Sequence, residues 1–431
     1  MRAEGATEGG TTVTASSGGN QQAFLRRKRR TAPLKITHII TEADLLGGAQ
    51  LNTLFSLQFQ QRSHGVECIV GNDGPLREQC ERSGIACAVI SMKNSLATPV
   101  TDVRSLVKLV RFLRRSRPDI VHTHSSKAGV IGRIAARLAR VPVVLHTMHA
   151  MPFNDRQPVY VQRAIIALER AMTMITDEQI VVADTLGIDL VKHRVCTPDQ
   201  VVTVVSGIDF ARFPKDYVDC RRSLRDELGL PPHAYVISSV GHLSRRKAHD
   251  VLLRVASALI PDHPQLWFLI VGGGSLESAL RAEIAFLGLT DRVLLLGVRD
   301  DVPRILAASD IFVQTSWQEG LSRSLVEAMY CGLPVVATDV NATKEVVRDG
   351  ETGFLVRAGD HAAMAARIKE LLADSRLREQ LGRGGRAAVS ETRTVDAMGE
   401  ALSQIYERHI ARYRRSSSQS RRFPLGLRGK Y

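Results

Sequence analysis

The sequence predicts an α/β protein of two doubly wound domains, each built on a parallel sheet that helices cover on both faces. Three observations support this fold class. At 431 residues the chain is too long for one ordinary hydrophobic core and long enough for two. Short runs rich in valine and isoleucine alternate with helix-length amphipathic segments along most of the chain. The strand-like runs are continuously apolar, which is typical of strands buried on both faces of a parallel sheet.

The first domain is expected at residues 34–207. Ordered structure should begin at Leu34, where an alternating apolar segment predicts the first strand. A unit of strand, turn and helix is then repeated up to residue 207. The expected strands are Leu34–Ile40, Glu67–Val70, Ala86–Ile90, Ile120–His124, Val143–His146, Ile180–Val182 and Val201–Val205, and the helices include Gln50–Gln61, Thr101–Arg115 and Val130–Ala139.

A polar stretch at residues 208–231 is predicted to be a linker, and a second series of strands and helices follows it at 232–390. A closing helix is expected at 391–410. The expected elements of the second part are Tyr235–Val240, His249–Leu259, Trp267–Val271, Leu276–Phe286, Val293–Leu296, Val302–Ala307, Ile311–Thr315, Leu321–Tyr330, Val335–Thr338, a helix at His361–Ala373 and one long segment, Leu377–Arg415. Ligands of doubly wound sheets bind at the carboxyl ends of the strands, so we expect a site in a cleft between the domains.

The net charge of +14 lies mainly in the two ends of the chain. Residues 1–33 contain six lysines and arginines against two glutamates, and residues 411–431 contain seven basic residues and no acidic one. Both segments are predicted to be flexible basic tails. The C-terminal tail also carries the apolar side chains Tyr413, Phe423, Leu425 and Leu427. We expect the tails to bind an anionic membrane surface, and the alternative is that they only increase solubility.

Other features of the composition favour a cytoplasmic protein that associates with the membrane only peripherally. No stretch approaches 18 uninterrupted apolar residues, so no spanning helix is expected. The first thirty residues lack the apolar segment of a secretory signal. The six cysteines are scattered without a CxxC pair, which is typical of reduced thiols.

The densest group of candidate site residues lies in Thr315–Thr338. A strand is expected to end at Thr315, a loop to carry Glu319 and Gly320, and a helix to start at Leu321 or Ser322. Free amides at a helix start bind phosphate. Glu327 would lie about two turns further along, roughly 10 Å along the axis, so that one carboxylate could bind a sugar and the other a ribose. The alternative is that two glutamates occur there by chance.

This block resembles the signature of retaining glycosyltransferases of the GT-B type, specifically family 4. Glu319 and Glu327 are separated by seven residues and are followed by Ala328-Met329 and by the sequence GLPVVAT at 332–338. Further segments that resemble family motifs are Gly47–Gln50, His122–Gly129, His146–His149, Gly207–Asp209 and Val240–Lys247. The resemblance covers residues 34–390 and implies a GT-B fold, in which two Rossmann-like domains face each other across a cleft.

The resemblance also implies roles for individual residues. Glu319, Lys247 and His149 would be catalytic, with Lys247 neutralising the departing nucleotide diphosphate and His149 hydrogen-bonding a sugar hydroxyl or the reacting centre. The donor would be bound by Gly47, Gly48, Arg245, Gly320, Leu321, Ser322 and Glu327. The chain departs from the family pattern at His242, where an arginine is usual, so that Arg245 or Arg246 would have to compensate. It departs again at Ala248, which replaces a glycine.

The activity implied is transfer of a sugar, as by a hexosyltransferase, from a nucleotide-sugar to a glycan or lipid-linked acceptor. The resemblance implies retention of anomeric configuration and a role in polysaccharide or glycolipid biosynthesis. UDP, GDP and ADP all stay open as the donor nucleotide. Neither a cofactor nor a metal is expected, because Asp300 and Asp301 begin a predicted helix and are better explained as a cap than as metal ligands.

Two alternatives stay open. A nucleotide-sugar 2-epimerase has the same fold, and product analysis would separate it from a transferase. A nucleic-acid-binding protein is suggested by the sequence pI near 9.8. The second is disfavoured because the charge lies in the tails and no recognition motif accompanies it, so nucleic acid is not an expected partner.

Overall fold

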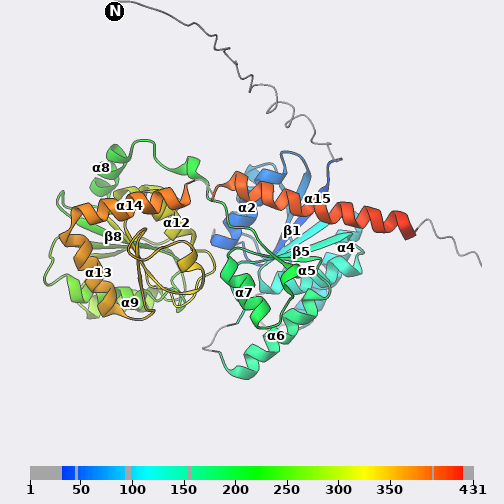
Figure 1. Ribbon diagram of the computed structural model, residues 1–431, viewed down its shortest axis with the longest axis horizontal. Coiled ribbons are helices and arrows are strands. Elements are labelled where there is room, and N and C mark those ends of the chain that lie inside the picture. The colour runs from blue at the N-terminus through cyan, green and yellow to red at the C-terminus, as the bar shows by residue number, and fades with distance from the viewer. Residues whose placement is uncertain (1–31, 44–46, 93–98, 154–156, 391–392, 421–431) are drawn as a thin grey trace, which may run out of the picture. The chain divides into compact units, whose positions relative to one another are not determined.

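The computed structural model describes residues 32–43, 47–92, 99–153, 157–390 and 393–420 (Figure 1). Most of the expected N-terminal tail, residues 1–31, lies outside the described residues, and so does the end of the C-terminal tail, residues 421–431.

The first domain is built on a seven-stranded sheet with the order β3-β2-β1-β4-β5-β6-β7, in which every pair is parallel. Helices connect most successive strands, as a parallel sheet requires. The elements are β1 (Lys35–Ile40), α2 (Gly48–Gln60), β2 (Gly65–Val70), α3 (Pro75–Arg82), β3 (Ala86–Val89), α4 (Pro99–Ser116), β4 (Ile120–His124), α5 (Ser126–Leu138), β5 (Val143–Met148), α6 (Val159–Thr173), β6 (Glu178–Val181), α7 (Asp184–Lys192), η1 (Pro198–Gln200) and β7 (Val201–Thr203).

The second domain is built on a six-stranded parallel sheet with the order β10-β9-β8-β11-β12-β13. The elements are η2 (Phe210–Arg212), α8 (Tyr217–Glu227), β8 (Tyr235–Val240), α9 (His249–Leu259), β9 (Leu266–Val271), α10 (Glu277–Phe286), β10 (Val293–Leu295), α11 (Val302–Ala308), β11 (Ile311–Gln314), α12 (Arg323–Tyr330), β12 (Val335–Thr338), η3 (Asn341–Glu345), β13 (Phe354–Val356), α13 (His361–Ala373), α14 (Ser375–Val389) and α15 (Val395–Ser420).

The predicted fold class of two doubly wound Rossmann-like domains is confirmed by these two parallel sheets. Strand β9 is apolar throughout because helices cover both faces of the sheet, and five of its six residues are buried. Strand β13, at the edge of the second sheet, is not among the expected elements.

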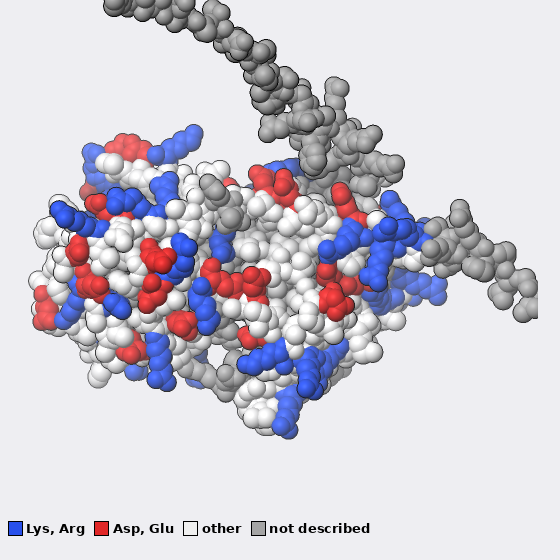
Figure 2. Space-filling model, viewed as in Figure 1, with Lys and Arg blue, Asp and Glu red and all other residues white. Residues whose placement is uncertain are grey.

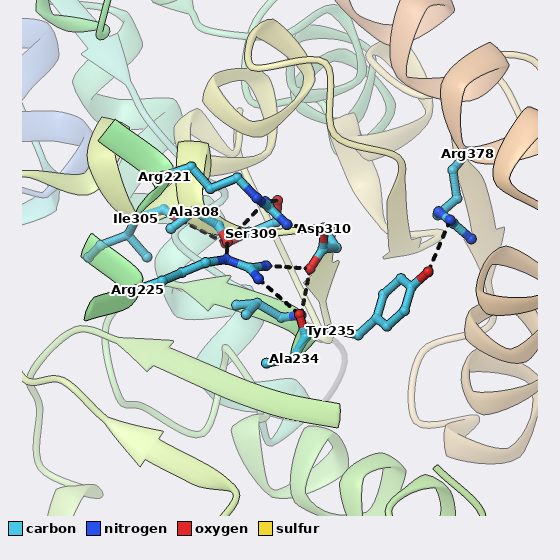
Figure 3. A network of polar contacts seen from close by, with 10 residues as sticks. Arg221, Arg225, Ala234, Tyr235, Ile305, Ala308, Ser309, Asp310 and Arg378 are labelled. Atoms are coloured by element: carbon cyan, nitrogen blue, oxygen red, sulfur yellow. Dashed lines mark hydrogen bonds and ion pairs between the residues drawn. The ribbon is translucent and has the colours of Figure 1, made fainter. Parts of the chain in front are cut away.

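The segment expected to be a linker contains a helix that docks on the second domain. Arg221 and Arg225 of α8 both reach Asp310, at 2.6 and 2.7 Å, and Arg225 also donates to the carbonyls of Ala308 and Ala234 at 3.0 Å (Figure 3). Asp310 accepts a further hydrogen bond from the backbone N–H of Val236 at 2.8 Å. The carboxylate therefore joins α8 to the starts of β8 and β11.

Replacing Asp310 with alanine is expected to destabilise the second domain by about 3 kcal/mol, because it leaves two partly buried guanidinium groups without their anion. The melting temperature should fall by roughly 5 to 10 °C in calorimetry. The matched control is Asp262→Ala, which breaks an exposed ion pair with Lys369 and should change stability by about 0.5 kcal/mol. Equal melting temperatures for the two variants would show that the Asp310 network does not hold α8.

The long C-terminal segment expected at Leu377–Arg415 contains separate helices in the structure. It is two helices, α14 and α15, separated by the residues around 390–394. Helix α15 lies along α2 and contacts β5 of the first domain (Figure 1), and it adds Met398, Leu402 and Tyr406 to that domain's core. It continues to Ser420, so the start of the expected flexible tail is helical. Within the described residues, no helix has the length and apolar character needed to cross a membrane.

Candidate active site

The strand order of each sheet reverses at one point, and several predicted site residues follow the strands that meet there. The reversal lies between β1 and β4 in the first sheet and between β8 and β11 in the second. Ligands of doubly wound domains bind outside the carboxyl ends of the strands at such a point. The chain after β1 leads to Gly47 and Gly48 at the start of α2, and the chains after β8 and β11 contain Lys247 and Glu319.

Lys247 and Glu319 form a buried ion pair beyond the ends of β8 and β11. Nζ of Lys247 lies 2.6 Å from Oε1 of Glu319, and the two side chains are only 13% and 5% exposed. The hydroxyl of Ser316 donates to the same carboxylate oxygen at 2.5 Å. The hydroxyl of Thr315 donates to the Lys247 carbonyl at 2.9 Å, which holds the two loops together.

Glu319 stays ionised despite its burial. Burial raises the pKa of this carboxyl, but the charges of Lys247 and Arg246 and the hydrogen bonds from Lys247 and Ser316 oppose it, so that the pKa lies below its usual value. The carboxylate therefore fixes the position of the Lys247 ammonium. An ammonium group has three donors, and those not used by Glu319 can bind phosphate oxygens.

The helix expected to follow Glu319 starts later than predicted. Its first residue is Arg323, so Leu321 and Ser322 lie in the turn before α12 and not inside it. The Ser322 side chain makes no capping hydrogen bond. The first amides of α12 can therefore serve a bound anion, and the helix dipole favours one there.

Glu327 is buried on α12 and pairs with Arg323, one turn earlier, at 3.8 Å. Glu327 lies about one turn into α12 and not the predicted two turns, because the helix begins only at Arg323. Burial raises the pKa of Glu327, and the charges of Arg323 and Arg212 only partly offset it, so the pKa lies above its usual value.

Arg323 is a site residue that the sequence analysis missed. Its Nη1 donates to the Gly207 carbonyl at 2.6 Å, and its guanidinium lies 5.2 Å from the centre of the Phe55 ring on α2. A Cβ built on Gly48 would lie 3.5 Å from Cδ of Arg323, so the predicted glycine loop reaches this arginine. The spacing of Arg323 from Glu327, i to i+4, is the signal that could have revealed it.

His149 and Gly320 lie directly against each other. A Cβ built on Gly320 would be 1.9 Å from the His149 carbonyl oxygen, so only glycine allows this approach. Burial, and then the charge of Arg323, lower the pKa of His149 to about 4, so the imidazole is neutral at pH 7. The structure thus brings His149 next to the loop that carries Glu319.

Arg245 is not brought to this centre. It is exposed and lines a pocket of about 370 Å³ together with Asp250, Glu283 and Trp317. The neighbouring Arg246 acts electrostatically on Glu319 instead. Of the two arginines expected to compensate for His242, the structure favours Arg246.

Ala248 occupies a position that favours glycine. It precedes α9 with φ +52° and ψ +47°, the left-handed region, which costs a residue with a Cβ about 1 kcal/mol. The glycine that family members usually carry here avoids this cost. The departure from the pattern at Ala248 is therefore accommodated by backbone strain beside Lys247.

Two family models cover most of the chain. The model described as Glycosyltransferase Family 4 matches residues 47–212, and the model described as Glycosyl transferases group 1 matches residues 221–388. Together they include the second sheet, all strands of the first sheet except β1, and the site segments that contain Gly47, Lys247 and Glu319.

The alignments with curated relatives cover most of this chain and most of each relative. The UDP-Gal:alpha-D-GlcNAc-diphosphoundecaprenol alpha-1,3-galactosyltransferase of Escherichia coli is 31% identical over 77% of this chain and 86% of the relative. A D-inositol 3-phosphate glycosyltransferase of Salinispora arenicola is 33% identical over 70% of this chain and 71% of its own length. The Staphylococcus aureus capsular polysaccharide biosynthesis glycosyltransferase CapM is 25% identical over 86% and 96%.

Solved structures share the fold at lower identity. HepE of Anabaena, in complex with UDP and glucose, has a TM-score of 0.77 and 22% identity over 87% of this chain and 99% of its own. WaaG, a glycosyltransferase involved in lipopolysaccharide biosynthesis, has a TM-score of 0.71 and 18% identity over 86% and 99%.

Proposed function

The chain belongs to glycosyltransferase family 4, and we propose that it transfers a hexose from a UDP-sugar to a lipid-linked glycan acceptor with retention of anomeric configuration. The observation that carries the proposal is the buried pair of Lys247 and Glu319, which places an ammonium group beyond the carboxyl ends of β8 and β11. The amino end of α12 follows this pair in the chain. A cation and a helix amino end are the groups that a diphosphate leaving group needs.

The names of similar proteins support the choice of donor and acceptor. The E. coli relative is named for a UDP-galactose donor and an undecaprenol-diphosphate acceptor. HepE was crystallised with UDP-glucose as well as with UDP. UDP is therefore the nucleotide we assign to this chain, and a sugar linked to a lipid diphosphate is the acceptor class.

The proposed reaction exchanges one glycosidic bond for another. The bond between the anomeric carbon and the UDP oxygen breaks, and UDP leaves with the electron pair. The acceptor hydroxyl oxygen bonds to the anomeric carbon on the same face, and its proton passes to the departing phosphate oxygen. Lys247 and the amides at the start of α12 stabilise the charge that develops on this phosphate.

Retention by attack on the same face is consistent with the contacts that hold the Glu319 carboxylate. Retaining hydrolases use a carboxylate as nucleophile, with a second carboxyl group nearby. Here Glu319 is held by Lys247 and Ser316, and both contacts are on the same oxygen, Oε1. We therefore assign Glu319 to holding Lys247 and the donor sugar rather than to covalent catalysis.

A divalent metal is not part of the proposed mechanism, because Lys247 and the α12 amides supply positive charge to the diphosphate. Treatment with EDTA should leave the rate within about twofold, a small change on the scale of an activation barrier. The rate is measured by UDP release before and after chelation, with heat-denatured protein as blank. Loss of activity that Mg²⁺ or Mn²⁺ restores would contradict this part of the mechanism.

A screen of nucleotide sugars tests the function itself. UDP-, GDP- and ADP-sugars are incubated with the protein, and both donor hydrolysis and the rise in melting temperature are measured. A ligand present at 100 times its Kd stabilises the folded state by about 2.7 kcal/mol, which such a screen detects. The proposal predicts that UDP-sugars stand out. Conversion of the donor to its 2-epimer, without transfer, would support the epimerase alternative instead.

We also propose that the basic ends hold the enzyme at an anionic membrane surface, where a lipid-linked acceptor is found. The end of α15 supports this, because Arg412, Tyr413, Arg414 and Arg415 are all exposed. Figure 2 shows lysine and arginine side chains gathered near this end of the described chain. Each basic residue near an anionic leaflet contributes about 1 kcal/mol to binding.

Vesicle co-sedimentation of the full chain and of residues 31–410 tests this location. The full chain should bind vesicles that contain anionic lipid, release them as salt increases, and bind far better than the truncated form. Truncation after Ile410 spares the core, since the residues that follow it on α15 are exposed up to Ser416. Equal binding by both forms would place the contact on α4, which exposes Val100, Val103 and Val107.

A further inference from the structure

Four histidines of the first domain form a buried row that the proposed reaction does not explain. His38 lies on β1, His122 and His124 lie on β4, and His149 directly follows β5. The first three side chains are fully buried. Neighbouring rings are 4.4 to 5.4 Å apart, centre to centre. Buried polar groups are costly unless they are hydrogen-bonded, so the partners of each ring nitrogen matter.

A continuous chain of hydrogen bonds runs from His149 to helix α2. Nε2 of His149 lies 3.1 Å from Nδ1 of His124, and Nε2 of His124 lies 2.9 Å from Nδ1 of His38. Nε2 of His38 lies 2.9 Å from Oε1 of Gln60. Both ring nitrogens of His38 and of His124 therefore make hydrogen bonds within this row.

The orientation of Gln60 is set by the last helix. Nε2 of Gln60 donates to the Tyr406 hydroxyl of α15 at 3.0 Å. That hydroxyl lies 2.6 Å from Nδ1 of His122, whose Nε2 lies 2.6 Å from the Thr147 hydroxyl. Because Nε2 of Gln60 donates to Tyr406, Oε1 of Gln60 is turned toward His38.

All of these imidazoles are neutral at pH 7. Burial lowers the pKa of His38 to about 4, although the hydrogen bond to Gln60 opposes it. Burial, followed by the neighbouring histidines, lowers the pKa of His122 and His124 well below the usual value. Each ring therefore carries one proton, either on Nδ1 or on Nε2.

The order of donors and acceptors along the hydrogen-bond chain fixes which nitrogen of each ring carries the proton. The Gln60 oxygen can only accept, so His38 carries its proton on Nε2 and accepts at Nδ1. His124 must then donate from Nε2 and accept at Nδ1. His149 in turn must donate from Nε2, which leaves an unprotonated Nδ1. The same reasoning accounts for every ring nitrogen of the chain up to this last one.

We propose that Tyr406 and Gln60 are positioning residues, which act through His38 and His124 to hold His149 in the Nε2-protonated tautomer with Nδ1 as a hydrogen-bond acceptor. An acceptor at this place suits a hydroxyl of the transferred sugar, which can donate to it. This use of Nδ1 rests on the proposed sugar transfer. The tautomer itself rests only on the hydrogen bonds, so the two claims can fail separately.

The tautomer is measured by long-range ¹H–¹⁵N NMR on the full chain labelled with ¹⁵N-histidine. The His149 signals are identified by their loss in His149→Gln. The inference expects a proton on Nε2 and none on Nδ1 of His149 in the wild-type protein. Tyr406→Phe should convert this single tautomer into a mixture. The opposite tautomer in the wild type, or no change in the variant, would overturn the inference, whether or not the protein shows transferase activity.

Kinetics separate positioning from a merely structural role. Tyr406→Phe should lower kcat/KM for the UDP-sugar about tenfold, the effect of one well-placed hydrogen bond, and leave inhibition by UDP within about twofold. Gln60→Met removes the α2 end of this hydrogen-bond chain and should lower kcat/KM by the same factor. The kcat/KM of the double variant should be no lower than that of the poorer single variant, because both residues act through the same hydrogen-bond chain.

The matched control is Tyr160→Phe, which removes a hydroxyl from a tyrosine that is 75% exposed. Its kinetics and its His149 tautomer should equal those of the wild type. Equal losses of UDP binding and of kcat/KM in Tyr406→Phe would show that the hydroxyl only supports the fold. Full kcat/KM in Tyr406→Phe would also overturn the positioning role.

Discussion

Replacing Lys247 or Glu319 with alanine is expected to lower kcat at least about 100-fold, the usual effect of removing a preorganised transition-state contact. Lys247 supplies the charge that meets the departing UDP, and Glu319 holds that charge in place at 2.6 Å. The measurement is the initial rate of UDP release with saturating donor and acceptor. Because the loss arises in the transition state, kcat should fall more than donor binding weakens.

Because this ion pair is buried, the loss of activity in the single variants must be distinguished from a loss of stability. Either single change leaves a buried charge without its partner, at a cost of about 3 kcal/mol. The double variant Lys247→Met with Glu319→Gln removes both charges and should recover most of the stability without the activity. The control Lys369→Ala disrupts an exposed ion pair and should have normal stability and normal activity. Near-normal turnover in Lys247→Ala would show that the diphosphate charge is met elsewhere.

Gly320→Ala is expected to abolish most activity through a single added methyl group. Its Cβ would lie 1.9 Å from the His149 carbonyl oxygen, and because both partners are backbone, the two loops must separate by about 1 Å. A displacement of that size at a reacting centre lowers a rate by about 100-fold. Steady-state kinetics and melting temperature are measured together, so that misplacement is distinguished from unfolding.

The control for the added methyl group is Gly65→Ala, whose Cβ would lie at an ordinary distance of 3.7 Å from the Leu34 carbonyl oxygen. This variant should retain normal turnover. Wild-type kcat in Gly320→Ala would mean that the loop of Glu319 and the segment of His149 do not need their close approach during catalysis.

Much of the fold could be predicted because strand and helix patterns are local. The apolar runs at β8, β9 and β12 gave their strands directly, and the loop after β11 could be recognised from Glu319 and its neighbours. The start of α12 was misplaced because Leu321 and Ser322 are compatible with a helix, whereas the loop before them packs against His149, which is distant in sequence.

The polar interior of the first domain could not be predicted in this way. His122 and Tyr406 are 284 residues apart in the sequence, and nothing local relates them. The strand Ile120–His124 is fully buried although three of its five residues are polar, and their partners lie on other elements, namely β1, β5 and α15. The hydrogen bond from Arg323 to Gly207, 116 residues away, is equally non-local, although the i to i+4 spacing of Arg323 from Glu327 is a local signal.

The configuration of the transferred sugar tests the central claim most directly. The protein is incubated with an α-linked UDP-hexose and a lipid-diphosphate-linked acceptor, and the anomeric proton of the purified product is examined by NMR. A retaining transferase with UDP leaving against Lys247 gives an α-linked product. A β-linked product, or a changed UDP-sugar with no sugar on the acceptor, would contradict the account.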